Sequence, residues 1–425
     1  MTDEWTQGFG PLESGLISGL ADNEVDVVVT GMGATTPIGH DVDSTWTALL
    51  AGASGTVILD EDWAQPLPVK LAAKQSREPS AVLDRVQLRR MDRSQQLGLI
   101  AAREAWADAG RPELEPERFA VVMGTGVGGA LTMLAQDEVI RTRGAKSVSP
   151  FTIPMLMPNG AAAVVSLDLG ARAGAHAPIS ACASGAEAIA LGLWMIRAGR
   201  ADVVLAGGTD ACVGRLAMAG FARMGALSRR EYDPHGASRP FDRGRDGFVL
   251  GEGAGAVVLE RASHARARGV RVHGRLAGAA VTSDAVDMTS PDHAGQVRAL
   301  SGAMRSARLT ASDVGYVNAH ATGTPAGDRA EADAIIAAVG RHPLVAATKA
   351  STGHLIGGAG AVEAIFTILS LQHNLVPPTR NLDEQDPDVK LDVVTAGPCE
   401  ARLNAALSNS FGFGGHNVVL AFVQP

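Results

Sequence analysis

Seven short apolar runs constrain the fold of this chain more than any other feature. They are rich in β-branched and small residues, end at a glycine or a turn, and begin at Val27, Phe119, Asp202, Gly255, Val314, Leu344 and Val418. Runs without polar alternation are typical of strands buried on both faces of a sheet. Ala/Leu-rich helical patterns lie at 94–109, 183–197 and 361–372. The sequence therefore predicts a layered α/β protein.

A weak internal similarity suggests that this architecture is duplicated. The segment 184–189 resembles the segment 360–365, and each opens an apolar helix after a glycine-rich turn. Chance similarity in an Ala/Gly-rich chain is the alternative. We place the boundary near Gly269, which gives an N-terminal half at 25–269 and a C-terminal half at 270–425. A flexible extension is predicted at 1–24.

Composition excludes several classes of protein. The net charge of -8 over 425 residues argues against general nucleic-acid binding. Three cysteines without CxxC spacing predict neither a disulfide framework nor a zinc site, and they favour a cytoplasmic location. No apolar run reaches the ~18 residues that a membrane span needs. Residues 1–24 lack the basic and apolar parts of a signal peptide.

Cys182 is the candidate nucleophile. It follows a short extended segment and precedes a helical pattern, so we expect the helix dipole to lower its pKa. The small residues Ala181, Ala183 and Gly185 leave room for an acyl thioester. An inert core cysteine is the alternative reading.

Two histidines follow in glycine-rich and threonine-rich turns. His320 comes directly after an apolar strand, and His354 follows Lys349 by five residues between another strand and a helix. Two imidazoles that donate N–H to one carbonyl oxygen would form an oxyanion hole for an enolate. Each histidine alone could equally be a capping or solvated residue. The glycine-rich runs at 31–36 and 124–129 lack a dinucleotide fingerprint and are interpreted as packing turns.

At these residues, and in two longer motifs, the chain closely resembles the elongating β-ketoacyl-acyl carrier protein synthases of type II fatty acid synthesis, which belong to the thiolase superfamily. The longer motifs are Ser-Arg-Pro-Phe-Asp to Gly-Glu-Gly at 238–253 and Asn-Ser-Phe-Gly-Phe-Gly-Gly-His-Asn at 409–417. The resemblance runs from Val25 to Val423. It implies a thiolase-like layered αβαβα fold made of two duplicated halves, and His416 in place of the commoner threonine indicates an actinobacterial branch.

The same resemblance implies roles for individual residues. Cys182 accepts the acyl chain, His320 and His354 serve decarboxylation and condensation, and Lys349 organises the site with support from Glu363. Phe413 is the gate beside the thiol, and its backbone N–H forms the acyl oxyanion hole with that of Cys182. Substrate binding is implied for Thr289, Thr322, Thr324 and Phe411. Ala321 and Asp287 depart from the family pattern, in which Gly and His are frequent.

The implied reaction is the decarboxylative Claisen condensation of malonyl-acyl carrier protein with a Cys-bound acyl chain, without a redox cofactor or catalytic metal. Both histidine-to-alanine variants are then expected to retain acylation of Cys182. The implied partners are acyl carrier protein, malonyl and acyl thioesters, and a second copy of the chain. A type II polyketide ketosynthase uses the same residues and remains an alternative. A non-catalytic chain-length subunit is less favoured, because such subunits usually lack the nucleophile.

Two surface features are candidates for contacts with partners. Carrier proteins are typically acidic, so docking is expected at a basic patch. The candidates are Arg85, Arg89, Arg90, Arg93, Arg141, Arg143 and Lys146. The proline-punctuated apolar segment 149–158 is the candidate dimer contact.

Overall fold

The computed structural model describes residues 25–425, so the predicted extension at 1–24 lies outside the described residues. Its centre is a mixed sheet with the strand order β13-β11-β10-β15-β16-β9-β1-β8-β6-β4-β5. Five strands come from the N-terminal part of the chain, namely β1 (Val27–Thr35), β4 (Phe119–Gly124), β5 (Ala175–His176), β6 (Val203–Asp210) and β8 (Gly253–Arg261). Six come from the C-terminal part, namely β9 (Gly274–Ser283), β10 (Val314–Asn318), β11 (Leu344–Ala346), β13 (Asp392–Val393), β15 (Ala405–Gly412) and β16 (His416–Val423). All seven predicted runs lie in strands of this sheet.

The two parts of the sheet repeat one connectivity. In the N-terminal part, β1 and β6 both pair antiparallel with β8, and β6 continues parallel to β4 and β4 to β5. In the C-terminal part, β9 and β15 both pair antiparallel with β16, and β15 continues parallel to β10 and β10 to β11. Two residue pairs between β1 and β9 join the parts. The predicted duplication is confirmed, and the boundary near Gly269 stays a prediction.

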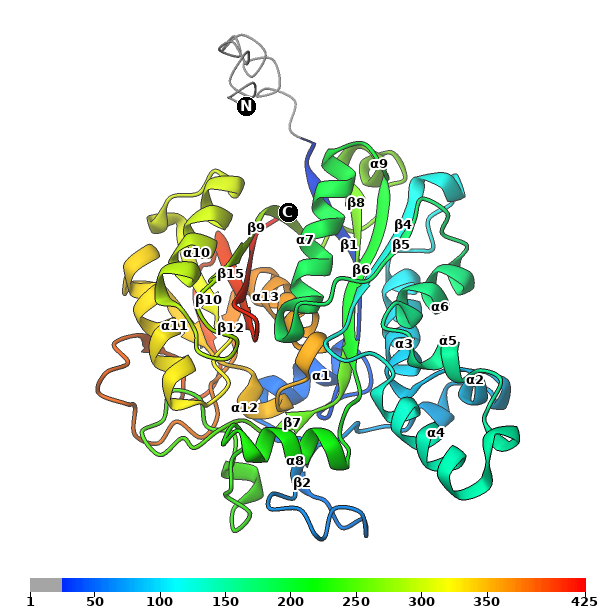
Figure 1. Ribbon diagram of the computed structural model, residues 1–425. Coiled ribbons are helices and arrows are strands. Elements are labelled where there is room, and N and C mark those ends of the chain that lie inside the picture. The colour runs from blue at the N-terminus through cyan, green and yellow to red at the C-terminus, as the bar shows by residue number, and fades with distance from the viewer. Residues whose placement is uncertain (1–24) are drawn as a thin grey trace, which may run out of the picture.

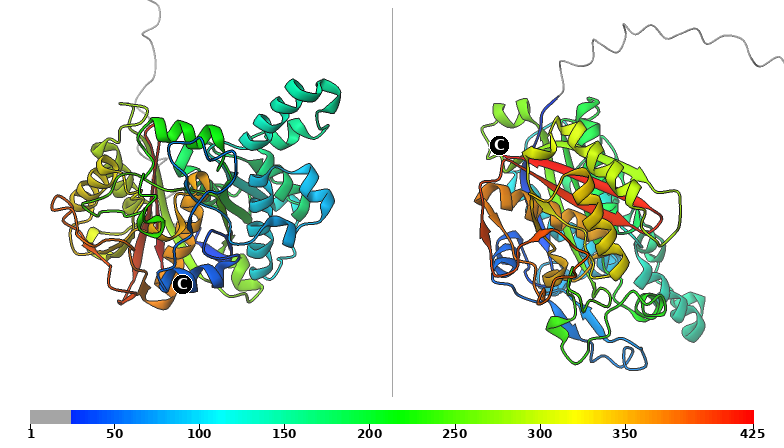
Figure 2. Two further views of the ribbon diagram at one scale, coloured as in Figure 1. Left: turned by 90° about the horizontal axis from the view of Figure 1, so that it is seen from below. Right: turned by 90° about the vertical axis from the view of Figure 1, so that its left-hand side faces the viewer.

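Helices form three layers around this sheet (Figure 1). The central layer contains α7 (Ser184–Arg197) and α13 (Ala359–His373), which pack between the two parts of the sheet. The outer face of the N-terminal part is covered by α3 (Arg93–Asp108) and α6 (Gly160–Leu169), and that of the C-terminal part by α10 (His293–Ala307) and α11 (Pro325–Ala338). This order confirms the αβαβα architecture, which a second view shows from below (Figure 2).

Glycines allow the layers to approach closely. A Cβ atom on Gly185 of α7 would lie 2.6 Å from the carbonyl oxygen of Gly357, just before α13. Gly31 and Gly33 face α3 in the same way, because a Cβ at either position would lie 2.1 Å from a carbonyl oxygen of that helix. Residues 31–35 of the 31–36 run belong to strand β1 and not to a turn, although the packing role is as predicted.

Smaller elements complete the described chain. They include α1 (Val42–Leu50), α2 (Arg85–Arg90), α8 (Arg215–Arg223), α9 (Ala262–Ala267) and α12 (Lys349–Thr352). Helices α4 (Ala130–Arg143) and α5 (Thr152–Leu156) project from the body, as the teal segment in Figure 2 shows. The short strands β2 (Thr56–Ile58), β3 (Leu71–Ala73) and β7 (Leu250–Gly251) pair with one another, as do β12 (Leu375–Val376) and β14 (Cys399–Glu400). Among residues 25–425, none of the helices has the length and apolar character required to cross a bilayer.

Candidate active site

Cys182 lies on a strained turn at the start of the central helix α7. The turn is a single 3-10 element, η4 (Ala181–Ala183), and Ala181 adopts a positive φ of 50°. This conformation is uncommon for a residue with a side chain and often marks a functional turn. The Ser184 hydroxyl secures the turn by accepting from the backbone N–H of Ser180 at 2.9 Å. Cys182 is half-buried and opens onto a cavity of about 560 Å³.

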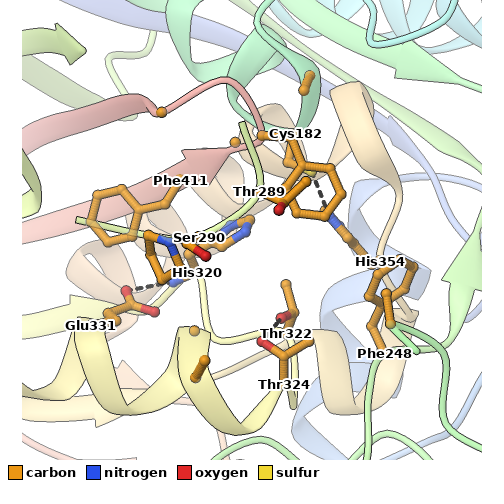
Figure 3. A pocket seen from close by; sticks show the side chains of 18 of the residues that line it. Cys182, Phe248, Thr289, Ser290, His320, Thr322, Thr324, Glu331, His354 and Phe411 are labelled. Carbon is orange, nitrogen blue, oxygen red and sulfur yellow. Dashed lines mark hydrogen bonds between the residues drawn. The ribbon is translucent and has the colours of Figure 1, made fainter. Parts of the chain in front are cut away.

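Two histidines from the C-terminal half, His320 and His354, lie close to this thiol (Figure 3). The Nε2 atom of His354 lies 3.0 Å from the Sγ atom of Cys182. The ring of His320 stands edge-on to that of His354, with centroids 5.4 Å apart. Phe248 packs against the other side of His354 at 5.2 Å. The structure therefore brings together Cys182, His320 and His354, as predicted from three separate turns.

Glu331 holds the His320 turn in place and was not identified from the sequence. This buried carboxylate of α11 accepts from the backbone N–H groups of His320 at 2.8 Å and Ala321 at 2.6 Å, and from the Asn409 side chain at 2.9 Å. It thereby joins β10, α11 and β15 at one point. An acidic residue on the buried face of an Ala/Ile-rich helix was the available signal.

Burial reverses the predicted protonation state of the nucleophile. Desolvation raises the pKa of Cys182 to about 12, while the charge of Lys349 and the backbone N–H of Phe413 act in the lowering direction. The helix position therefore does not make the resting thiol a thiolate. The expectation of a lowered pKa is wrong, because it considered the helix dipole and not the low-dielectric surroundings. At neutral pH the Cys182 side chain is therefore a neutral thiol.

Both imidazoles are neutral for the same reason. Burial, reinforced by the positive charge of Lys349, holds the pKa values of His320 and His354 well below the ordinary histidine value. Among the described protein groups, neither Nδ1 atom has a hydrogen-bond partner. The Nε2 atom of His354 faces the Cys182 thiol, and an imidazole nitrogen in this position can accept or donate a proton.

Lys349 and Glu363 form a buried ion pair behind the histidines. The Nζ atom of Lys349 contacts the Oε1 atom of Glu363, and both side chains are almost completely buried. Neither residue lines the cavity. Lys349 acts on the site through its charge, which lowers the pKa of each histidine and of Cys182.

Asp210 connects the two halves close to the Cys182 turn, and it was not identified from the sequence either. It ends β6, is completely buried, and accepts from the backbone N–H groups of Gly126 and Gly357, each at 2.7 Å. Its other oxygen accepts from the Thr125 hydroxyl at 2.8 Å. Gly357 belongs to η7 (Ile356–Gly358), the turn before α13 that corresponds to the Cys182 turn. The rule that polar residues gather at the carboxyl ends of strands would have identified Asp210.

The remaining predicted residues line the cavity. These are Thr289, Thr322, Thr324, Phe411 and Phe413. The Thr322 and Thr324 hydroxyls lie 3.1 Å apart (Figure 3), and Thr289 donates its backbone N–H to Asp287 at 2.8 Å. Asp287, one of the departures from the family pattern, therefore shapes the loop that carries Thr289. Val127, Phe221, Met224 and Ile356 add apolar walls that suit a hydrocarbon chain.

One of the predicted basic residues is not available for a partner. Arg93 forms ion pairs with the buried Glu252 and with Glu78, at 2.6 and 2.7 Å. It belongs to the packing of α3, so its inclusion in a docking patch is wrong. Arg85, Arg89 and Arg90 are exposed, and the guanidinium of Arg90 lies over the Phe151 ring at 4.8 Å.

Two family models match most of the chain and show that it belongs to the β-ketoacyl synthase family. Residues 24–265 match the family described as "Beta-ketoacyl synthase, N-terminal domain", and residues 273–383 match "Beta-ketoacyl synthase, C-terminal domain". The chain is also similar to the "3-oxoacyl-[acyl-carrier-protein] synthase 2" of Mycobacterium tuberculosis, with 44% identity over 402 residues. That alignment covers 93% of this chain and 96% of the relative.

Solved structures show the same similarity in three dimensions. A β-ketoacyl synthase from Burkholderia phymatum superposes with a TM-score of 0.89 at 35% identity, covering 94% of this chain and 100% of the other. A second similar structure is described as a type II PKS acyl-carrier protein in complex with its ketosynthase bound to the hexaketide. It has a TM-score of 0.86 and 29% identity, and covers 95% of this chain and 100% of the other.

Proposed function

Since the chain belongs to the β-ketoacyl synthase family, we propose that its cavity carries out the chain-elongating condensation of fatty acid synthesis. The enzyme is a β-ketoacyl-[acyl-carrier-protein] synthase, an acyltransferase that joins an acyl group to a malonyl-derived carbon pair. Curated relatives at 40–44% identity are named 3-oxoacyl-[acyl-carrier-protein] synthase 2, which favours this reading over the polyketide alternative. The intact Cys182, His320 and His354 cluster argues against a non-catalytic subunit.

Acylation of Cys182 is the first step. The contact at 3.0 Å lets Nε2 of His354 take the thiol proton as Sγ attacks the acyl thioester on the carrier protein. The backbone N–H groups of Cys182 and Phe413 stabilise the tetrahedral oxyanion. The imidazolium then returns its proton to the departing pantetheine thiol. The products are acyl-Cys182 and free carrier thiol, so His354 is neutral again.

Condensation follows when malonyl-carrier protein occupies the cavity. The malonyl carboxylate leaves as CO2, and its bonding electrons form an enolate whose oxygen receives N–H groups from His320 and His354. The enolate carbon attacks the Cys182 thioester and displaces the thiolate, which takes up a proton. Neutral imidazoles suit this role because they donate N–H to the enolate oxygen without forming an ion pair that would stabilise the malonyl carboxylate before it leaves. Thr289, Thr322, Thr324 and Phe411 hold the pantetheine arm, and Phe413 gates the thiol.

The contact between Cys182 and His354 is the observation that carries this proposal. Intact-mass analysis after incubation with acyl-carrier protein should show one acyl adduct, absent in Cys182→Ala. Addition of malonyl-carrier protein should convert the adduct to a product two carbons longer. An adduct of equal yield in Cys182→Ala would refute the assignment of the nucleophile.

Docking of the carrier protein is assigned to exposed arginines. Arg85, Arg89 and Arg90 lie on and beside the short helix α2, and the negative charge of carrier proteins favours such a surface. Reversal of Arg89 and Arg90 to glutamate should raise KM for carrier-bound substrate much more than for a pantetheine thioester. Equal effects on both substrates would exclude this patch. Arg402→Glu is the matched control, because this exposed arginine belongs to neither group of docking candidates.

A homodimer is supported by apolar exposure around α4 and α5. Ile153 is 63% exposed, and Met133 and Ile140 are each about half exposed. Strand β5, which packs against α6, is an edge strand of the sheet. An exposed apolar group of this kind beside an unpaired edge is typical of a subunit contact. Sedimentation should give a dimer that Ile153→Glu weakens, and a fully active species of one chain mass would contradict the assembly. A cytoplasmic location fits three free cysteines.

A further inference from the structure

The three reactive side chains of the cavity form a group that metal ions favour. The Sγ atom of Cys182 and one ring nitrogen each from His320 and His354 all lie within 4.8 Å of one another. They come from turns separated by up to 172 positions along the chain, so no short sequence motif predicts that they lie together. One thiol and two imidazoles are ligands that Zn²⁺ binds strongly.

The spacing of these atoms is close to that of a tetrahedral zinc site. Zn–S bonds of about 2.3 Å and Zn–N bonds of about 2.0–2.1 Å place ligand atoms roughly 3.3–3.6 Å apart. Cys182 and His354 are already 3.0 Å apart, and the widest pair needs movements of about 1 Å or less per side chain. His320 and His354 approach edge to face, and one ring nitrogen of each lies within 4.8 Å of the other and of the Sγ atom of Cys182.

The surroundings leave room for a dication and a fourth ligand. Cys182 is open to the cavity, which supplies space for a water molecule at the remaining tetrahedral position. The positive charge of Lys349 is paired with Glu363, and the buried Asp210 lies close enough to act electrostatically on the thiol. The local charge therefore does not exclude Zn²⁺.

We propose that Cys182, His320 and His354 form an inhibitory zinc site in the unacylated enzyme. Zn²⁺ replaces the thiol proton, which passes to water, and forms one bond to Sγ and one to each imidazole. Bound Zn²⁺ occupies the electron pair that would attack the acyl thioester. An acylated Cys182 has no thiolate to offer, so the acyl-enzyme resists the ion. The site rests on the proposed active site and adds a control over its first step.

Zinc binding to the full chain tests this proposal. The probe is Zn²⁺ alone, titrated against a chromophoric chelator in the absence of substrate, and one ion should bind per chain. Cys182→Ala, His320→Ala and His354→Ala should each weaken binding at least about tenfold. Cys399→Ala is the matched control, because this cysteine lies outside the site and should leave affinity unchanged. Thermal unfolding of each variant verifies that it is folded.

A second measurement needs no variant. Co²⁺ added to the wild-type protein should give the visible absorption of a tetrahedral ion with a thiolate charge-transfer band, and prior acylation of Cys182 should abolish both. Undiminished zinc affinity in Cys182→Ala or in the acyl-enzyme would overturn the proposal, as would the lack of binding at micromolar zinc. Acylation measured by mass in the presence of a chelator reports the proposed function separately, so failure of one does not imply failure of the other.

Discussion

His320 and His354 make different contacts in the structure, although the sequence alone does not distinguish them. His354 touches the Cys182 thiol, whereas His320 contacts His354 and Phe411. We therefore expect His354→Ala to slow acylation of Cys182, and His320→Ala to leave acylation almost unchanged. Both variants should lose malonyl decarboxylation, by about 10²–10³-fold, because each removes one donor to the enolate. The expectation that both variants retain acylation is thus revised for His354.

The size of the acylation effect follows from the pKa of the thiol. A pKa of about 12, against the ordinary 9.0, lowers the fraction of Cys182 present as thiolate about a thousandfold at a given neutral pH. This corresponds to about 4 kcal/mol more free energy to ionise the thiol. A positioned general base contributes about 10²–10⁴-fold, which is enough to offset this loss. Without His354, acylation should slow at least about 10²-fold near neutral pH, and the residual rate should rise about tenfold per pH unit as thiolate forms.

Rapid-quench acylation followed by intact-mass analysis measures this directly. Wild type, His354→Ala and His320→Ala are mixed with acyl-carrier protein across pH 6 to 10, and the adduct on Cys182 is followed over time. Acylation of His354→Ala at the parent rate would show that the thiol is activated without the imidazole. Equal losses in both variants would show that the 3.0 Å contact does not distinguish the two histidines.

Three further predictions concern charge around the nucleophile. Alkylation of Cys182 by iodoacetamide should still be accelerating above about pH 10, where a thiol with the ordinary pKa of 9.0 levels off, and a plateau near pH 10 would contradict a pKa of about 12. Asp210→Asn should shift that profile to lower pH, since the Asp210 charge raises the pKa of Cys182; an unchanged profile would mean that Asp210 is structural only. Lys349→Met should lower the free energy of unfolding in urea by about 3–5 kcal/mol, because it leaves Glu363 buried without its partner. The double variant Lys349→Met with Glu363→Gln should recover most of that loss, and no recovery would mean that the pair is not the cause.

Strands with continuous apolar sequence were predicted well. β4 and β10 begin at the predicted residues, because both faces of such strands are covered and every position is selected for burial. The two-residue strands β5 and β13 carry no such signal. β15 was not identified as a strand because its polar residues serve the site, as when Asn409 bonds Glu331. A local sequence pattern therefore indicates whether a residue is buried among apolar groups, but it does not identify a strand whose residues are polar because they bind other groups.

In the active site, too, locally encoded residues were predicted and residues with distant partners were not. The nucleophile and both histidines were identifiable, since each lies on a turn that joins a strand end to a helix, and this arrangement is encoded within a few residues. Glu331 and Asp210 were missed because their partners are backbone N–H groups from distant elements. The Glu331 contacts form only when β10, α11 and β15 of the C-terminal half assemble, and the Asp210 contact with Gly357 forms only when the two halves pack against each other.

The sequence by itself therefore determined the α/β layers and the residue types available for thiol chemistry, since these depend on short-range patterns. The duplication was decided by the matching strand connectivity of the two parts of the sheet. Only the tertiary structure decided the protonation states and the pairing of those residues. The pKa of Cys182 depends on how much solvent the assembled protein removes, and the surroundings that raise it come from both halves. Packing also brings the Nε2 atom of His354 to 3.0 Å from the Sγ atom of Cys182, which lies 172 positions away in the sequence. The proposed general base and the proposed zinc site both depend on this contact.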